Sequence, residues 1–500
     1  MSDRRSLPDH PSLRRLRDEA KTRRRSGEFP SLSFAHLAIA REHGFASWPR
    51  LKLHVDALTL DSAERAEGLV RSACSDNIRR AQALLEVDPA LARHDLACAC
   101  VTGDAVTVTR FVGVSPERAS APTGPLGRAP ILYACFSRLG RGDPERAASI
   151  RAVVRVLLNA GADADARYMN GDWAQSTLYG AAGIAGDAEL TALLLAAGAD
   201  PDDRGPVHSV GEALYHACEQ SDPDCARLLI EAGTDAGTVT HCLGRALNFP
   251  NLAMIRMFCE HGARPAPHHL LQAVWRRRGV ETVELLLDAG APVDGDPAEG
   301  DPSALQVAER WGDDEVAALL RVHGADASRV TGGDRALGAW LAGRDGATPP
   351  RDSPEQRRAL DQMFEMAVDR GELATVRRLL DAGVGGAGPL VDEGEDAPEF
   401  TPLGVAAWRG YADVAAELVK HGAPTEFPGG GSAIGAALHG SRHCQDPEGG
   451  PTMATIDEVD RGRYRATVRT LLALGARVPD HLEDRGPSVT TLMAELGLAD

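Results

Sequence analysis

The chain has 500 residues, of which 43% are hydrophobic and 25% charged, a balance that excludes wholesale disorder. Acidic residues outnumber basic ones by 72 to 54, and the net charge of −18 disfavours generic binding to nucleic acid or to anionic membranes. No apolar stretch reaches the ~18 residues of a membrane span. The N-terminal segment is charged and has no apolar h-region, so we expect no signal peptide. Nine cysteines without a C-x-x-C pair predict a reduced, cytoplasmic protein.

The first 60 residues combine a basic segment with a small helical module. Residues 1–25 contain nine Arg or Lys against four Asp or Glu, and we expect this segment to be a solvated arm docked on the acidic remainder. Apolar residues at Leu37, Ile39 and Phe45, followed by Trp48, predict two helices within 31–58 that meet at Gly44.

A short phrase then recurs along the chain, with leucines followed by glycine and usually alanine. Clear copies are LLNAGADADA at 157–166, LLLAAGADPD at 193–202 and LVKHGAPTEF at 418–427. A leucine pair marks the apolar face of a helix, and glycine ends the helix because it adopts the left-handed conformation at little cost. We therefore expect helix ends in that conformation at the phrase glycines, which are Gly161, Gly198, Gly233, Gly262, Gly290, Gly324, Gly383, Gly422 and Gly475.

About 20 residues before each phrase glycine lies an alanine-rich segment, clearest in TPLGVAAWRGYADVAAEL at 401–418. The pattern predicts a short helix ended by Gly410 and a second, antiparallel helix over 412–420. Such a helical hairpin cannot bury its apolar face alone, so neighbouring hairpins must stack. We count about eleven units over residues 64–480, an all-α solenoid array placed at 61–480 after the 1–60 module and before a C-terminal cap at 481–500.

The segment TPLGVAAWRGYADV resembles the ankyrin repeat, whose pattern opens T-P-L-H-x-A-A and closes L-L-x-x-G-A-D. Gly404 stands where the family usually has His. The 31–58 segment is similar to a helical module found ahead of ankyrin arrays in bacterial proteins. That resemblance, together with a strong preference for Arg over Lys, suggests a bacterial source. The resemblance implies a stacked scaffold whose concave face binds another protein.

Several insertions interrupt the expected period. They lie near 137–147, 327–358, 384–399 and 440–463. Insertions in repeat arrays map to loops on one face, which is often the binding face; neutral elaboration of the surface is the equal alternative.

The main candidate site is a column of variable positions just before the helix-ending glycines. In ankyrin-type units these positions project onto the concave face, and from residue 276 to 409 they are rich in Arg and Trp. Arg binds carboxylate or phosphate through planar paired donors, and exposed Trp and Arg are typical of interface hot spots. The predicted partner-binding residues are Arg276, Arg277, Arg310, Trp311, Arg370, Trp408 and Arg409. The alternative is that they merely solubilise the surface.

A second candidate is a small-ligand pocket within 133–219, where four of the six tyrosines lie. Its lining would be Tyr133, Tyr168, Trp173, Tyr179 and Tyr215. If this pocket were catalytic, an acid–base set of His216, Glu219 and Asp172 would be the first suspects. The bland alternative is that the tyrosines fill gaps in the core.

No nucleophile elbow, phosphate loop, dinucleotide fingerprint or H-E-x-x-H occurs, so we expect no cofactor and no metal. His94, Cys98 and Cys100 offer donor atoms, but Cys98 and Cys100 would point to different sides of a helix. His439, His443 and Cys444 gather with Asp446 at the 440–463 insertion; their donor types would fit a metal site, but one His is at a helix end, and ordinary polar loop residues are the favoured alternative. The sequence thus favours a non-catalytic protein-recognition scaffold that grips an acidic or amphipathic partner segment. Its rival is an enzyme or a small-molecule-binding protein, and nucleic-acid binding is the weakest reading.

Overall fold

The computed structural model describes residues 5–8, 10–29, 32–75, 77–203, 211–295, 302–344, 354–385, 401–427, 431–443 and 456–477. They fall into two compact units that meet in sequence at Thr238 and Val239. Helices dominate, and the strands in the described residues are a single antiparallel pair, so the predicted all-α class is confirmed. None of the described helices has both the length and the apolar character that a membrane span requires.

The first unit begins with a three-helix module of α1 (Leu13–Arg25), α2 (Leu32–Glu42) and α3 (Trp48–Thr59). The predicted pair of helices around Gly44 corresponds to α2 and α3. The basic segment differs from the expected solvated arm, because it forms helix α1 and buries Leu16 and Ala20 against Ile39 and Leu51. An apolar stripe hidden among nine basic residues is enough to fix the helix to its neighbours.

Hairpin α22–α23 shows why the repeat folds as it does. Helix α22 (Pro402–Arg409) begins where the hydroxyl of Thr401 accepts a hydrogen bond from the backbone N–H of Gly404 at 3.0 Å. It ends at Gly410, which has a φ of 79° that favours glycine. Helix α23 (Ala412–Lys420) then returns antiparallel and packs on α22. Small alanines in α22 allow this close packing, as the sequence predicts.

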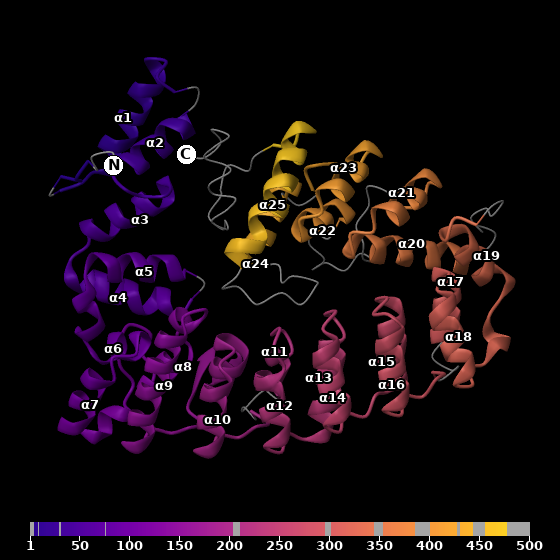
Figure 1. Ribbon diagram of the computed structural model, residues 1–500, viewed down its shortest axis with the longest axis horizontal. Coiled ribbons are helices and arrows are strands. Elements are labelled where there is room, and N and C mark those ends of the chain that lie inside the picture. Colours follow the sequence, from indigo (N-terminus) through magenta and orange to yellow (C-terminus); the bar gives the residue numbers. More distant parts are fainter. Residues whose placement is uncertain are drawn as a thin grey trace. The chain divides into compact units, whose positions relative to one another are not determined.

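In the first unit the hairpins follow one another in sequence, and neighbouring hairpins are in contact (Figure 1). Four hairpins in this unit open with an element of only six or seven residues, and one of these four elements, η4, is a π-helical turn. The bounds are α4 (Ser62–Ala73), α5 (Ile78–Val87), α6 (Leu96–Thr102), α7 (Ala105–Val114), α8 (Pro130–Cys135), α9 (Pro144–Asn159), η4 (Tyr179–Ala185), α10 (Ala188–Ala196), α11 (Glu212–Ala217) and α12 (Asp224–Glu231).

The second unit continues the same arrangement, except that α19 has no partner helix of its own among the described residues (Figure 1). The bounds are α13 (Ala236–Ala246), α14 (Leu252–Glu260), α15 (Pro267–Trp275), α16 (Val280–Asp288), α17 (Ala304–Trp311), α18 (Asp314–Val322), α19 (Gly332–Leu341), α20 (Pro354–Asp369), α21 (Leu373–Asp381), α22, α23, α24 (Ala433–His443) and α25 (Ile456–Ala473). Counting both units, the described residues form eleven hairpins, from α4–α5 to α24–α25, which agrees with the predicted number.

The two chemical devices that end and begin these helices recur. All nine phrase glycines have positive φ values, from 72° at Gly383 to 108° at Gly233, as predicted. Many second helices start at an Asp or Asn whose side chain accepts a hydrogen bond from the backbone N–H three residues later. Such N-caps are worth about 1 kcal/mol each, and they are found at Asp104, Asp143, Asp187, Asn251 and Asp313.

The predicted insertions have different outcomes. Residues 137–147 form the short 3₁₀ turn η3 (Arg138–Gly140) and the start of α9, whereas 327–358 contains η6 (Ala327–Arg329) and a complete helix, α19, packed on α17. Most of 384–399, the centre of 440–463 and the whole of 481–500 lie outside the described residues. Within the otherwise helical array, strands β1 (Arg167–Asn170) and β2 (Trp173–Ser176) form a hairpin over the YMNGDWAQ segment, with Asn170 opposite Trp173, so that Gly171 and Asp172 form the turn.

Candidate functional site

Four of the five predicted partner-binding arginines lie close together in the second unit. Arg276 and Arg277 follow the end of α15, Arg370 follows the end of α20, and Arg409 is the last residue of α22. The ends of these helices meet although Arg277 and Glu372 are 95 residues apart in sequence. We call Arg276, Arg277, Arg278, Arg370 and Arg409 the arginine cluster.

Two carboxylates hold the cluster in place. Arg409 donates from Nε and Nη2 to Oδ1 of Asp369, at 3.0 and 2.8 Å. Arg277 donates to Oε2 of Glu372 at 2.8 Å, and Arg370 donates to Oε1 of the same residue at 2.7 Å. Arg370 also donates to the backbone carbonyl of Arg276. Charge-assisted bonds of this kind fix the geometry of the guanidinium groups.

Arg276 is the member of the cluster whose positive charge has the most distant carboxylate partner among the four that pair with Asp369 or Glu372. Its nearest carboxylate oxygen is Oδ2 of Asp369 at 3.7 Å, which is too far for a hydrogen bond. Within the part of the chain that the structure describes, its guanidinium makes no hydrogen bond at all, although the side chain is only 27% exposed. Burial lowers the pKa of Arg276, and the nearby charges of Arg409, Arg245 and Arg370 lower it further, against the opposing effect of Asp369. An excess of positive charge therefore surrounds this side chain.

Arg278 was not predicted, and it adds to the excess. It donates to the backbone carbonyls of Leu247 at 2.8 Å and Asn248 at 2.5 Å, so it closes the end of α13 without neutralising a carboxylate. Burial lowers its pKa to about 9, and the charges of Arg276 and Arg370 act in the same direction. Arg278 remains charged at neutral pH. Three successive arginines at 276–278 were visible in the sequence, but only the first two occupied the predicted column.

Arg310 and Trp311 differ from the prediction, which placed them on an exposed stripe. The side chain of Arg310 is 7% exposed and donates from Nε to Oδ1 of Asp334 at 2.6 Å, a buried ion pair between α17 and α19. Trp311 is also buried, at 5% exposure. The unforeseen helix α19 covers this part of α17, so these two side chains do not extend the cluster as a surface.

Tryptophans border the arginine cluster. Arg277 lies over the ring of Trp311, with its Cζ 5.3 Å from the ring centroid, and the edge of Trp275 meets the same ring at 6.4 Å. Arg409 lies 4.8 Å from the ring of Trp408, which is half-buried. Aromatic rings attract guanidinium groups, and the half-buried rings of Trp275 and Trp408 also place apolar surface beside the charges.

The predicted tyrosine pocket of the first unit is only partly assembled. Tyr133 is fully buried, donates to the carbonyl of Thr123 at 2.7 Å and accepts from the N–H of Leu126 at 3.0 Å, so it is part of the core. Phe136, which was not predicted, joins Tyr168 and Tyr179, with centroid distances of 5.2 and 5.8 Å.

A hollow of about 660 Å³ lies next to Tyr168, between the 119–131 segment and strand β1. Tyr168 is the predicted aromatic residue that lines it, together with Arg128, whose Cζ is 3.4 Å from the tyrosine ring centroid. Tyr133, Trp173, Tyr179 and Tyr215 are not among its lining residues. Trp173 and Asp172 are exposed on the β1–β2 hairpin.

The predicted catalytic residues His216 and Glu219 lie side by side, but the histidine is held by two glutamates and is not a free base. His216 lies between two glutamates, 3.2 Å from Glu219 and 3.6 Å from Glu212. Burial would lower the pKa of His216, but hydrogen bonds and charge from both glutamates outweigh it and raise the pKa to about 9. The imidazole is thus protonated at neutral pH, when a general base must be neutral. Tyr179 and Tyr215 contact its ring edge at 5.0 and 5.4 Å.

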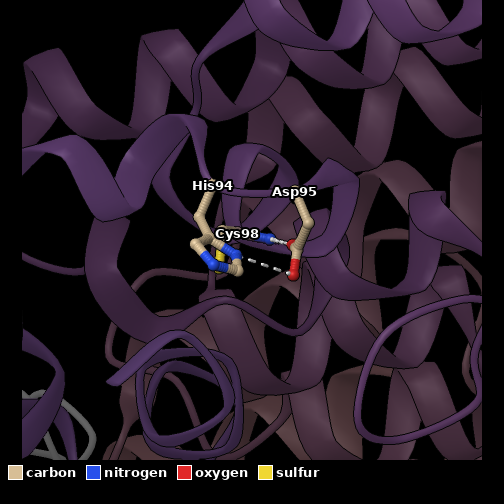
Figure 2. A group of neighbouring side chains, drawn as sticks. All are labelled: His94, Asp95 and Cys98. Atoms are coloured by element: carbon tan, nitrogen blue, oxygen red, sulfur yellow. Dashed lines mark hydrogen bonds and ion pairs between the residues drawn. The ribbon is translucent and has the colours of Figure 1, made fainter. Parts of the chain in front are cut away.

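His94, Asp95 and Cys98 form the group of possible metal donors that the described residues contain (Figure 2). Asp95 caps α6 by accepting from the N–H of Cys98 at 2.7 Å, and His94 lies 3.5 Å from its other oxygen. Burial and Asp95 raise the pKa of the Cys98 thiol, which opposes the thiolate that a metal needs. Hydrogen bonding at a helix start explains this group. Cys444 and Asp446 of the second group lie outside the described residues.

No family model matches the chain. Over 219 residues, which are 44% of this chain, it is 27% identical to human "Ankyrin repeat and SOCS box protein 16", and the match spans 38% of that protein's length. Two solved structures are similar. The human ASB11 ankyrin repeat domain has 20% identity and a TM-score of 0.34, with 46% of this chain and 97% of that domain covered. The ankyrin repeat domain of Bcl-3 has 25% identity and a TM-score of 0.33, with 40% and 89% covered.

The sequence match, the repeated phrase and the eleven hairpins agree with one another. The match spans well under half the length of the curated relative, so the similarity does not extend to that protein's other parts. The chain is homologous to ankyrin-repeat proteins, as its motifs predict.

Proposed function

We propose that this chain is a non-catalytic protein-recognition scaffold of a bacterial cytoplasm, and that its arginine cluster receives an acidic or amphipathic segment of the partner. Ankyrin-repeat proteins generally act as scaffolds for protein interaction, and stacked hairpins present a preformed surface with little ordering cost on binding. The partner segment would lie across the ends of α15, α20 and α22.

The observation that carries the proposal is the state of Arg276. A half-buried guanidinium without a hydrogen-bond acceptor is costly, and four arginines here share two carboxylates. A carboxylate from a partner would supply the missing acceptor. Trp408, half-buried beside Arg409, would cover an apolar side chain next to that carboxylate.

The enzymatic alternative has less support. His216, its first suspect, is held between Glu212 and Glu219 with a pKa raised to about 9, after burial is overcome by the two carboxylates. Such a group is suited to an internal ion pair and poorly suited to taking up a proton from a substrate. Of the two buried residues that the sequence assigned to the partner site, Trp311 lies against Arg277, and Arg310 is paired with Asp334.

The test is affinity capture by the full-length chain from a bacterial lysate, with mass spectrometry of both proteins and small molecules. Parent protein would be compared with Arg276→Gln and with Arg256→Gln, a matched control whose exposed guanidinium pairs with Glu281 at 2.8 Å on the outer helices. We expect a protein that is captured by the parent and by the control, and whose purified form binds Arg276→Gln at least tenfold more weakly.

Two results would count against the proposal. One is that every captured protein binds Arg276→Gln as tightly as the parent, with circular dichroism showing both to be folded. The other is that a metabolite, and no protein, is retained.

A further inference from the structure

The arginine cluster has more donor capacity than a single carboxylate can use. A guanidinium has five N–H donors, and none of those of Arg276 is used within the described residues. Arg409 and Arg370 flank Arg276 closely enough for their charges to act on it. Their own bonds to Asp369 and Glu372 hold them in position beside Arg276, which lies 3.7 Å from the same Asp369.

The charge balance points in the same direction. Arg276, Arg277, Arg370 and Arg409 share the carboxylates of Asp369 and Glu372, and Arg278 adds a fifth cation whose hydrogen bonds go to backbone carbonyls. Five cations and two carboxylates leave three surplus positive charges. A monoanionic carboxylate from a partner would neutralise one of them and leave two. A phosphoryl group carries about −1.5 to −2 at pH 7 and offers three acceptor oxygens, so it matches the surplus better.

We propose, building on the function above, that the arginine cluster recognises a phosphorylated side chain of a protein partner, with Arg276 as the principal contact and Arg370 and Arg409 beside it. Arginine suits this task because its planar fork donates two parallel hydrogen bonds to phosphate oxygens. Trp408, against Arg409, is placed to cover a residue next to the phosphorylated one.

Two features favour a protein over a nucleic acid as the source of the phosphate. The chain carries a net charge of −18, which repels a polyanion over long distances. Asp369 and Glu372 also lie within the cluster itself, so a series of phosphates would meet carboxylates as well as arginines. A single phosphoryl group can contact Arg276 without approaching both acids.

The experiment uses the full chain and defined probes, measured by isothermal titration calorimetry at one fixed ionic strength. The probes are inorganic phosphate, the capped peptide Ala-Ala-Ser-Ala-Ala phosphorylated on serine, the same peptide with Asp in place of phosphoserine, and a ten-residue oligothymidylate. The proteins are the parent, Arg276→Gln, Arg276→Lys and the control Arg256→Gln. Arg276→Lys keeps the charge and removes the fork.

We expect the phosphopeptide to bind at least tenfold more tightly than the Asp peptide. Arg276→Gln should weaken that binding at least tenfold, Arg276→Lys should give an intermediate loss, and the control should bind as the parent does. Quenching of tryptophan fluorescence on titration would provide an independent readout, because three tryptophans border the cluster.

Each other outcome overturns the proposal in an identifiable way. Equal binding of the Asp peptide and the phosphopeptide, both dependent on Arg276, removes phosphate recognition but leaves the acidic-partner function in place. Inorganic phosphate bound equally by Arg276→Gln and by the parent indicates an adventitious ion only. If the oligothymidylate binds more tightly than the phosphopeptide, the site recognises nucleic acid and the proposal is wrong. Finally, if the phosphopeptide binds through Arg276 but no cellular protein depends on Arg276 for binding, the proposed function is refuted and phosphate recognition stands.

Discussion

The sequence predicted where the arginines of the site lie in each repeat, but it did not predict which side chains surround them. The repeat places Arg276, Arg277, Arg370 and Arg409 at or just after the ends of α15, α20 and α22, and the structure brings them together. Their acidic partners could not be foreseen, since Arg277 and Glu372 are separated by 95 positions and no local pattern links them. Whether the cluster binds a partner stays a prediction. The expected exposure of Arg310 and Trp311 was wrong, because Arg310 pairs with Asp334 of α19, and Trp311 packs against Trp275 and Arg277.

Arg310 should matter for stability rather than for recognition. In Arg310→Met the carboxylate of Asp334 would remain buried without its ion-pair partner, and breaking such a pair costs about 3–5 kcal/mol. We expect the free energy of unfolding in urea, followed by circular dichroism, to fall by about that amount. Arg256→Met, which removes an exposed ion pair, should change it by about 0.5 kcal/mol or less.

The same variant has a defined pH dependence. Burial would raise the pKa of Asp334, but hydrogen bonds from Arg310 and Thr331 lower it on balance. A carboxyl group with a lowered folded-state pKa stabilises the protein above its ordinary pKa of about 4, and this contribution is lost as the pH falls through the folded-state value. The difference between parent and Arg310→Met should therefore be largest near pH 7 and shrink steadily as the pH falls, because protonation of Asp334 relieves the variant of its unpaired buried charge before it affects the parent. A difference that grows on acidification would contradict this assignment.

At the scale of elements, the sequence was most informative where glycine or a capping residue ends or begins a helix. The left-handed glycines and the hairpins between them were predicted. Helix α1 was missed because charge masks its few apolar residues, and α19 was missed because it interrupts the repeat period. A signal for α19 did exist, since Thr331 and Asp334 form a capping box at its start. The β1–β2 hairpin had its Asn170–Gly171 dipeptide as a signal.

Gly338 tests how closely α19 packs on α17. A Cβ at this position would lie 1.8 Å from the backbone oxygen of Glu309 and 2.8 Å from the nitrogen of Gly312, and backbone atoms cannot move aside as a flexible side chain can. Alanine gains roughly 1 kcal/mol over glycine inside a helix, but overpacking of this severity costs about 1–3 kcal/mol or more. We expect Gly338→Ala to lower the free energy of unfolding by about 2 kcal/mol or more, since a Cβ only 1.8 Å from a backbone oxygen places the overpacking cost at the upper end of that range.

The matched control is Gly113→Ala in α7, where a Cβ would meet nothing within 4 Å and φ is not positive. This change should raise stability slightly, by about 0.5 kcal/mol, through helix propensity alone. If both variants were stabilised equally in urea unfolding, the close approach of α17 and α19 would not constrain the protein.

For the whole molecule, the number of hairpins could be counted from the repeats, whereas the division into two units could not. The repeated phrase passes through the Thr238–Val239 boundary without a change in composition, and Gly233 and Gly262 on either side have the same conformation. The division into units depends on which residues far apart in sequence contact each other, as Arg277 and Glu372 do. The repeat pattern in the sequence does not say which distant residues will meet.

A stacked array of hairpins should lose structure locally when one hairpin is weakened, because each hairpin is stabilised mainly by its neighbours. Leu194 in α10 and Leu286 in α16 are both fully buried, and truncation of such a leucine to alanine costs about 2–5 kcal/mol. In Leu194→Ala we expect faster amide hydrogen exchange in α10 and in its contacts α9, η4 and α12, with no change in α22 and α23. In Leu286→Ala the faster exchange should be confined to α16 and its contacts α14, α15 and α18, while α6 and α7 keep the parent rates. Hydrogen-exchange mass spectrometry on the full chain would measure both variants with the same peptides. Uniform acceleration through both units in either variant would mean that the array unfolds as one cooperative body, and nearest-neighbour stacking would then not account for its stability.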